Sequence, residues 1–544
     1  MNKKARMLSL VMGTVLAFSV TGCNKTDKSS DVDSKEANSG TVSFSATLST
    51  DGVDNENSMI GKEWKKMMEA KMGKKLDIKF NYIPSSEYDE KVKLMITSDD
   101  VTDFFMTPLF YDTTDMAAQG QILELSQYKE NMPNYMKFLG QVKNGMARAT
   151  NAEGKMYYFK ETSSPRFPAD KGMLIQNVSS YRYDVFKAND IKVPQTLDEF
   201  YDAAKKIKQL YPDKYPVATR WNSLRTLFSA NHVTDDIYWD GNKYVYGPLS
   251  EGYKEALQFA NKLYSEKLLD PEYTIDTDDT LKKKALNSDN FMWLVDWFTT
   301  PGEYTRTAND GKVFAVSLYP DNPKYGKAWQ QVSNANTQDL GWGTFCISSK
   351  AKNPEDLVKF VDYQYAEDVI RLITWGIEGT TYKMGADGVP TFVDSLKNAS
   401  DPWVEADKYG MRASRKHRPG LQMSDDSRAY VDFAPKDYTV FDNKYEEVPI
   451  EKSPFLRNLP MPKNDYIPSW FDEPGIQLTT EENQEVSEIM NPVKTFVTEE
   501  QAKFVSGKSN LNDWSKFTDQ IKKMGDIDKV LKIYNDAAQR ALSK

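Results

Sequence analysis

The chain has 544 residues, a formal net charge of −9 and only two cysteines. A body this acidic lacks the basic face that nucleic-acid binding requires, so we expect no nucleic-acid partner. The length is enough for two large lobes or for three to four ordinary domains.

The N-terminus has the features of a secretory signal. Three basic residues within the first six positions precede an apolar stretch from Met7 to Val20, shorter than the about 20 apolar residues that a transmembrane helix needs. The stretch ends in VTGC, up to Cys23, and resembles the bacterial lipobox, although Val20 stands where Leu is preferred. The resemblance implies removal of residues 1–22 and attachment of fatty acids such as palmitate to Cys23. The alternative is an ordinary secreted protein that is cleaved nearby.

A polar segment follows the cysteine. Residues 24–41 (NKTDKSSDVDSKEANSGT) contain almost no apolar side chain, so they cannot bury a core. We predict that residues 23–41 form a flexible tether between a lipid anchor and the folded body.

The first folded elements alternate between strand and helix. The patterns predict a strand at 42–49, a helix ending near Gly73, a strand at 76–82, a helix opened by Ser86 and a strand at 101–110. Strand, helix, strand, helix, strand is typical of a parallel α/β sheet.

Later helices carry start signals. Thr196 and Thr498 each open a capping-box pattern, Ser250 is a candidate N-cap, and Asn353 precedes a first-turn proline. Apolar strand runs lie between these helices (GMLIQ, YPVAT, FMWLVDWF, KVFAVSLY and GTFCISS), so the sequence is α/β almost throughout. The segment 433–474 is rich in proline and aromatic residues and predicts an ordered loop.

The run FMWLVDWF, residues 291–298, predicts a strand that is covered on both faces. Ligands in open α/β sheets bind beyond the strand ends. Asp296 and Trp297 near such an end would offer a carboxylate acceptor beside a flat apolar ring, which suits a sugar. The structural alternative is that Trp293 and Trp297 both belong to the core.

Four segments resemble family 1 extracellular solute-binding proteins of ABC importers, in the branch of Gram-positive lipoproteins linked to oligosaccharide uptake. They are residues 181–212, 255–273, 352–382 and 532–542. The resemblance implies an α/β, two-lobe fold of the type II periplasmic-binding-protein class, with a hinge and an interlobe cleft. One lobe would hold residues 42–165 plus 342–400, and the other 166–341 plus 401–544.

The resemblance also implies ligand contacts at several positions, to which the strand-end argument adds Asp296. The candidate ligand-binding residues are Arg166, Thr107, Phe110, Glu378, Arg220, Trp221, Asp296 and Trp297. Each has a structural alternative: Arg220 pairs with a surface acid, Glu378 orders its own loop, and Arg166 belongs to the hinge. We expect Trp375 to be core.

The sequence predicts no metal site and no cofactor. Some relatives that bind acidic oligosaccharides carry a calcium loop, but the run DTDD at 276–279 lacks its glycine and distal glutamate. His232 and His417 stand far apart and show no metal-ligand spacing. With Cys23 lipidated, Cys346 has no disulfide partner and is expected to be buried.

Three functions remain open at this point. In the first, a monomeric, membrane-anchored receptor captures an oligosaccharide outside the cell and passes it unaltered to the permease subunits of an ABC transporter. The second is a surface glycosidase or lyase, for which paired carboxylates would be needed. The third keeps the binding fold but takes a peptide. The sequence shows no nucleophile elbow and no phosphate loop, which favours binding over catalysis.

Overall fold

The computed structural model describes residues 40–543, except for 51–53, 55, 109–110, 112, 143, 165–173, 176, 222, 299, 309, 334–338, 387, 400–401, 412–423, 427–428, 430–438, 442–445 and 449–472. Cys23, Phe110, Arg166 and His417 lie outside the described residues, as does most of the loop predicted at 433–474.

The first of two six-stranded sheets is built mostly from the N-terminal third of the chain. In spatial order it contains β16 (Ser424–Asp426), β4 (Phe159–Ser164), β13 (Asp339–Ile347), β3 (Phe104–Met106), β1 (Thr41–Thr50) and β2 (Lys75–Pro84). β1 runs parallel to both β2 and β3, which confirms the predicted parallel start. β13 is antiparallel to β3 and β4, so the complete sheet is mixed.

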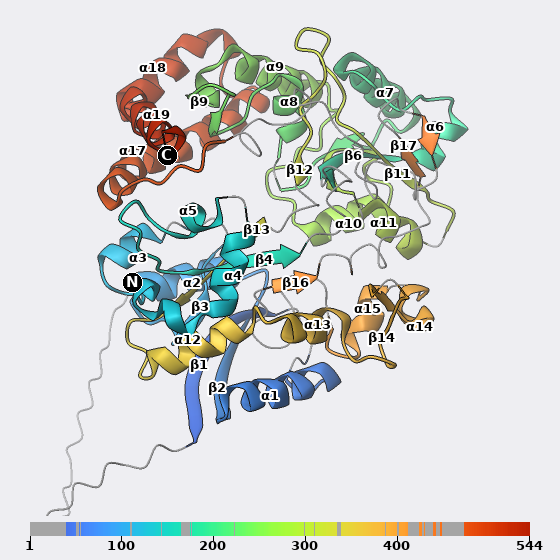
Figure 1. Ribbon diagram of the computed structural model, residues 1–544. Helices are drawn as coiled ribbons and strands as arrows, with labels where there is room; N and C mark the ends of the chain where they lie inside the picture. The colour runs from blue at the N-terminus through green and yellow to red at the C-terminus, as the bar shows by residue number, and fades with distance from the viewer. Residues whose placement is uncertain are drawn as a thin grey trace, which may run out of the picture. The chain divides into compact units, whose positions relative to one another are not determined.

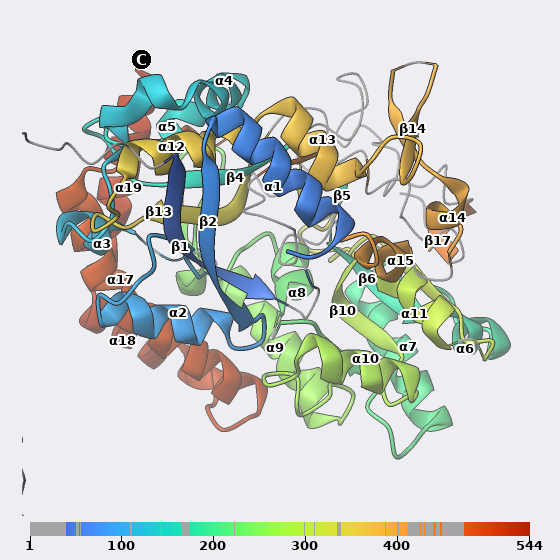
Figure 2. The same cartoon turned by 90° about the horizontal axis from the view of Figure 1, so that it is seen from below.

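Helices cover both faces of this sheet, as Figure 2 shows for α1 and α2 on opposite sides of β1 and β2. Neighbouring residues of a strand point to opposite faces, so Phe104 enters the core under α1, whereas Phe105 packs against α2. The helices of this region are α1 (Met59–Met72), α2 (Tyr88–Thr97), α3 (Thr114–Ala118), η1 (Leu125–Asn131), α4 (Pro133–Gln141), α5 (Gly145–Ala149), α12 (Pro354–Tyr363), α13 (Glu367–Trp375), α14 (Asp394–Lys397) and α15 (Pro402–Asp407), with the hairpin β14 (Tyr382–Met384) and β15 (Pro390–Phe392).

The second sheet has a core of its own. Its spatial order is β18 (Glu447–Val448), β17 (Thr439–Phe441), β11 (Phe314–Ser317), β6 (Asn177–Arg182), β10 (Met292–Trp297) and β7 (Val217–Ala218). β10 is buried on both faces up to Asp296, which confirms the prediction for residues 291–298. Trp293 is fully buried, and so are Trp375 and Cys346 in the first core.

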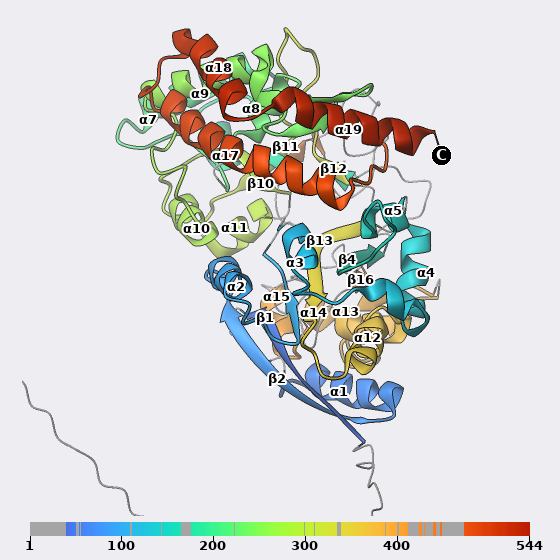
Figure 3. The same cartoon turned by 90° about the vertical axis from the view of Figure 1, so that its left-hand side faces the viewer.

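The second core is covered by a larger set of helices. They are α6 (Tyr183–Ala188), α7 (Leu197–Leu210), α8 (Arg225–Ala230), η2 (Gly247–Leu249), α9 (Glu251–Ser265), α10 (Asp278–Leu286), α11 (Thr300–Ala308), α17 (Thr480–Val505), η6 (Leu511–Asp513), α18 (Trp514–Met524) and α19 (Ile527–Leu542), with the hairpin β8 (Ile237–Trp239) and β9 (Tyr244–Tyr246). α17 packs against α9, α18 and α19, and these helices run close together in Figures 1 and 3.

The chain passes between the two sheets three times. It leaves the first sheet after β4, returns to it at β13, and crosses again between β16 and β17. Near the first two crossings, β5 (Leu174–Ile175) pairs with β12 (Val332–Ser333) in a separate two-stranded sheet. Two sheets with separate cores, joined by several crossings, are the architecture expected for two α/β lobes.

Three details differ from the sequence-based expectations. The N-cap of α2 is Glu87 rather than Ser86. Thr498 does not open a helix but lies inside α17, whose capping box is formed by Thr479 and Glu482. Residues after 401 do not all join the second lobe, since Ala406, Met411 and Ala429 are buried in the first core and β16 pairs with β4. None of the described helices combines the length and the apolar character needed to cross a membrane.

Candidate functional site

Two dipeptides, Arg220-Trp221 and Asp296-Trp297, come together at one edge of the second sheet. β7 ends at Ala218, two residues before Arg220, and β10 ends at Trp297. β7 and β10 run parallel, with Met292 opposite Val217. Because parallel strands have their carboxyl ends at the same edge, both dipeptides lie where α/β sheets bind ligands.

Arg220 and Asp296 form a buried ion pair. Arg220 Nε donates to Asp296 Oδ1 over 3.0 Å, and the backbone N–H of Trp297 donates to the same oxygen over 2.8 Å. Asp296 Oδ2 accepts from Ser180 Oγ at 3.2 Å. Burial raises the pKa of Asp296 above its ordinary value, while the guanidinium of Arg220 acts in the opposite direction. Asp296 has no exposed surface, and in this structure its carboxylate positions Arg220.

The other donors of Arg220 reach two helices. Nη1 donates to Asp278 at the start of α10 over 2.7 Å, and Nη2 donates to the hydroxyl of Tyr304 in α11 over 2.9 Å. The side chain of Asp278 is 63% exposed, so the structural alternative for Arg220, a pair with a surface acid, is present. The guanidinium therefore braces the turn after β7 against three other elements.

The two tryptophans of these dipeptides meet edge to face. The ring centroids of Trp221 and Trp297 are 5.4 Å apart at an interplanar angle of 79°, an arrangement that aromatic pairs favour. Trp221 is 44% exposed and its backbone has φ 56°. Backbone strain of about 1–3 kcal/mol is expected for a large residue in this region, and such strain clusters at functional sites. The structure thus presents an exposed indole in a fixed orientation.

Three further polar residues, one of them directly across from Trp297, were missed from the sequence. Asn177 of β6 is the direct cross-strand partner of Trp297, so their side chains share a face. Arg225 Nη1, at the start of α8, donates to Asn177 Oδ1 at 3.5 Å and to Gln331 Oε1. Asn177 and Gln331 are 1% exposed. The sequence offered one indication of Arg225: like Arg220, it follows β7 closely, at the start of α8.

Thr107 and Glu378 belong to the first lobe. Thr107 is buried, and its backbone N–H donates to the carbonyl oxygen of Thr344 over 2.8 Å. Glu378 is exposed in the turn before β14, and its backbone forms an isolated β-bridge with Tyr382. Among the described residues, no hydrogen bond, ion pair or ring contact joins either of them to the tryptophan pair.

Two carboxylates of the acidic run at 276–279, those of Asp276 and Asp278, form ion pairs with basic side chains. Lys284 Nζ lies 2.8 Å from Asp276, 2.8 Å from Glu272 and 3.1 Å from Asp270, while Asp278 pairs with Arg220. In the part of the chain that the structure describes, no group of three or more His, Cys, Asp or Glu side chains is placed to hold a metal ion.

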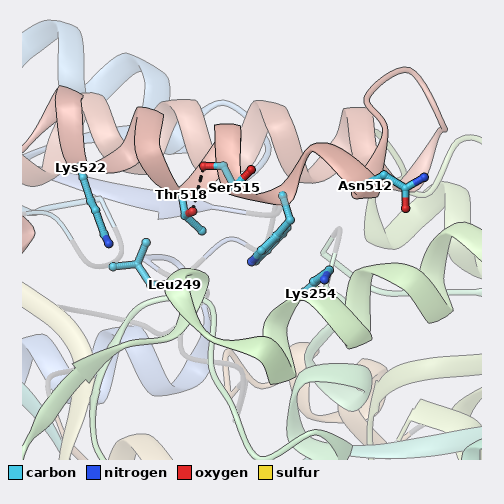
Figure 4. A pocket seen from close by; sticks show the side chains of 7 residues that line it. Leu249, Lys254, Asn512, Ser515, Thr518 and Lys522 are labelled. Atoms are coloured by element: carbon cyan, nitrogen blue, oxygen red, sulfur yellow. Dashed lines mark hydrogen bonds between the residues drawn. The ribbon is translucent and has the colours of Figure 1, made fainter.

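An open cavity of about 490 Å³ lies elsewhere on the second lobe, between η2 and α9 on one side and α18 on the other. Figure 4 shows Lys254 and Lys522 projecting into it from these two sides. Trp514 and Asn512 also line it, but none of the residues that the sequence predicted for the ligand site does.

The sequence matches a family model and two curated proteins. The model of the family described as bacterial extracellular solute-binding protein matches residues 55–370. The polygalacturonan/rhamnogalacturonan-binding protein YtcQ of Bacillus subtilis (strain 168) is 21% identical over 402 residues, which cover 71% of this chain and 76% of YtcQ. Lipoprotein LipO of the same organism is 25% identical over 235 residues, 39% of this chain and 42% of LipO.

The fold matches a solved structure over almost its whole length. The alginate-binding protein AlgQ2 in its calcium-free form superposes with a TM-score of 0.70 at 19% identity, covering 92% of this chain and 99% of AlgQ2. At this identity the likeness establishes the fold, which is the two-lobe α/β fold expected from the sequence.

Proposed function

The chain belongs to the bacterial extracellular solute-binding protein family, and from this premise we propose that it binds an oligosaccharide at Trp221 and Trp297 and delivers it to an ABC transporter. The observation that supports this most is the edge-to-face pair of Trp221 and Trp297, one ring of which is well exposed. Sugars combine an apolar C–H face with directional hydroxyls, so an aromatic ring beside guanidinium donors suits them.

The relatives support a carbohydrate ligand over a peptide. YtcQ is named for binding polygalacturonan and rhamnogalacturonan, and AlgQ2 for binding alginate; all three ligands are polysaccharides. One common way to capture an extended peptide is by main-chain hydrogen bonds along a sheet edge. The described part of the proposed site presents rings and side-chain donors instead.

Members of this family bind solutes, and the carboxylates of the proposed site do not suit hydrolysis. A glycosidase needs two carboxyl groups that both reach the sugar. Asp296 is fully buried and accepts three hydrogen bonds, while Asp278 is paired with Arg220. Binding without chemistry is therefore the activity that these residues support.

A lipid anchor at Cys23 would hold the protein at the outer face of the cell membrane, as a monomer beside its permease. The VTGC sequence at Cys23 supports this, together with the similarity to a protein named as a lipoprotein. Two acyl chains on one residue suffice for stable attachment, whereas a single chain is marginal. The ligand would favour the closed state by contacting both lobes, and the permease would recognise that state.

The test is calorimetry of the purified protein against a panel of plant and bacterial oligosaccharides and of short peptides, with each sugar analysed after incubation. Tight binding of an intact oligosaccharide is the expected result. Release of shorter products would establish the glycosidase or lyase instead. Binding of peptides without any sugar would make the protein a peptide receptor.

A further inference from the structure

Arg225 contacts Asn177, the cross-strand partner of Trp297, and one edge of its guanidinium has no acceptor among the described residues. Its Nη1 donates to the side-chain oxygens of Asn177 and Gln331. Among the described residues, none accepts from Nε or from Nη2, the two nitrogens that form one edge of the group. That edge has the spacing that binds the two oxygens of a carboxylate.

The charge of Arg225 is not used for an ion pair within the described chain. Asp235 offsets it at a distance, but no carboxylate of the described residues lies within 4.0 Å of its nitrogens. Arg225 is half-buried. The buried arginines among the described residues of this lobe differ from it: Arg220 pairs with Asp278 and Asp296, and Arg182 with Asp184. An arginine that served only to stabilise the lobe would be expected to form an ion pair with a carboxylate, as these two do.

The residues that hold Arg225 are themselves buried and incompletely satisfied. Asn177 is 1% exposed, and its Nδ2 has no hydrogen-bond partner among the described residues. A buried donor without a partner is unfavourable, and such a group needs an explanation. Asn177 lies directly across from Trp297, and its Oδ1 accepts from Arg225 Nη1. It therefore holds the open edge of Arg225 close to the strand position of Trp297.

We propose that Arg225 receives a carboxylate of the ligand, so that the site selects an acidic oligosaccharide, one that contains uronate residues. This inference rests on the proposed function, since it assigns the class of sugar that the tryptophan site takes. Asn177 and Gln331 hold the guanidinium with its free edge turned to the ligand. Trp297 supplies the apolar surface for the sugar ring that carries the acid.

The test compares two forms of one ligand, trigalacturonate and its fully methyl-esterified form, which has nearly the same shape and no charge. Neutral oligosaccharides and trimannuronate complete the panel. The variants are Arg225→Gln, Arg225→Lys and, as a control that also removes one positive charge, Lys192→Gln. Lys192 is exposed and forms no ion pair with the described residues. Affinities are measured by calorimetry, and folding is checked by thermal unfolding.

We expect the wild type to bind an acidic trisaccharide about 10- to 100-fold more tightly than its ester. Arg225→Gln should weaken binding of the acid far more than binding of the ester and so abolish this preference, and an unchanged thermal unfolding midpoint shows that the variant is folded. Arg225→Lys should keep part of the preference, because lysine retains the positive charge but cannot form the bidentate hydrogen bonds of a guanidinium. Lys192→Gln should bind like the wild type.

The possible failures are distinguishable. If a neutral sugar binds and no uronate does, or if Arg225→Gln weakens acid and ester equally, the assignment of Arg225 is wrong and the proposed function stands. If no sugar of either kind binds the wild type, the proposed function itself fails.

Discussion

Arg220 Nε lies 3.0 Å from Asp296 Oδ1, and each of these two residues is followed in the sequence by a tryptophan of the proposed site. Arg220 and Asp296 are buried and hold their two loops together. The residues that follow them, Trp221 and Trp297, contact each other through their indole rings. The buried ion pair therefore fixes the separation of the two rings before any ligand arrives, which lowers the entropy lost on binding.

Replacement of either tryptophan should weaken sugar binding. We predict that Trp297→Ala and Trp221→Ala each lose about 1–3 kcal/mol of binding free energy, since each removes an aromatic anchor. Because the rings touch, the losses in the double variant should not add. Calorimetry measures all three. Trp514→Ala is the matched control, since it removes a half-buried indole that lines the separate cavity, and unchanged affinity in both single variants would remove the pair from the site.

The ion pair should matter for stability. Arg220→Met leaves the carboxylate of Asp296 buried without its cation, and we predict a loss of about 3–5 kcal/mol in the free energy of unfolding. Urea unfolding measures this. Lys516→Gln is the control: it breaks an ion pair to Asp513 whose side chains are 79% and 52% exposed, and it should cost at most about 1 kcal/mol. Equal stability of the two variants would contradict the bracing role of Arg220.

Thiol chemistry tests the lipid anchor. Cys346 is fully buried, and burial raises the pKa of its thiol to about 12. We therefore predict no alkylation of Cys346 in the native protein at pH 8, since the reactive thiolate is absent and inaccessible. After denaturation, protein extracted from membranes should show one reactive thiol, because the proposed anchor would occupy the sulfur of Cys23. Two reactive thiols would contradict the lipid anchor, as would retention of Cys23→Ser in the membrane pellet.

Alkaline pH should destabilise the fold through buried tyrosines. Burial raises the pKa of Tyr181 to about 12, above its ordinary value of 10.0. Between these two values the unfolded chain releases the phenol proton and the folded chain keeps it, so the free energy of unfolding falls as pH rises. One tyrosine accounts for a loss that approaches about 2.7 kcal/mol once the pH exceeds both pKa values. Urea unfolding from pH 9 to 11.5 should show a smaller decline for Tyr181→Phe than for the wild type; identical declines would contradict this.

The sequence predicted the elements whose signals are local. The parallel start of the first sheet followed from alternating apolar residues, and the buried strand β10 from an unbroken apolar run. The place of Asp296-Trp297 near a strand end followed from the apolar run, and Arg220-Trp221 was a candidate through the family resemblance. That the two dipeptides pair is a finding of the structure.

What the sequence did not predict depends on distant contacts. Arg225 was missed because its partners, Asn177 and Gln331, come from remote segments. Thr498 matched a helix-start pattern, but its hydroxyl donates to the carbonyl oxygen of Lys494 inside a continuous helix. A capping residue is indistinguishable by local pattern from one that bonds back to the preceding turn. The return of 424–426 to the first sheet likewise depends on pairing with β4.

The most direct test of the account is a crystal structure of the protein with a bound oligosaccharide. We predict a sugar ring in van der Waals contact with the indole of Trp221 or Trp297, and no ligand in the cavity between α9 and α18. A sugar held in that cavity or on another surface, with both indoles uncovered, would contradict the assignment of the binding site.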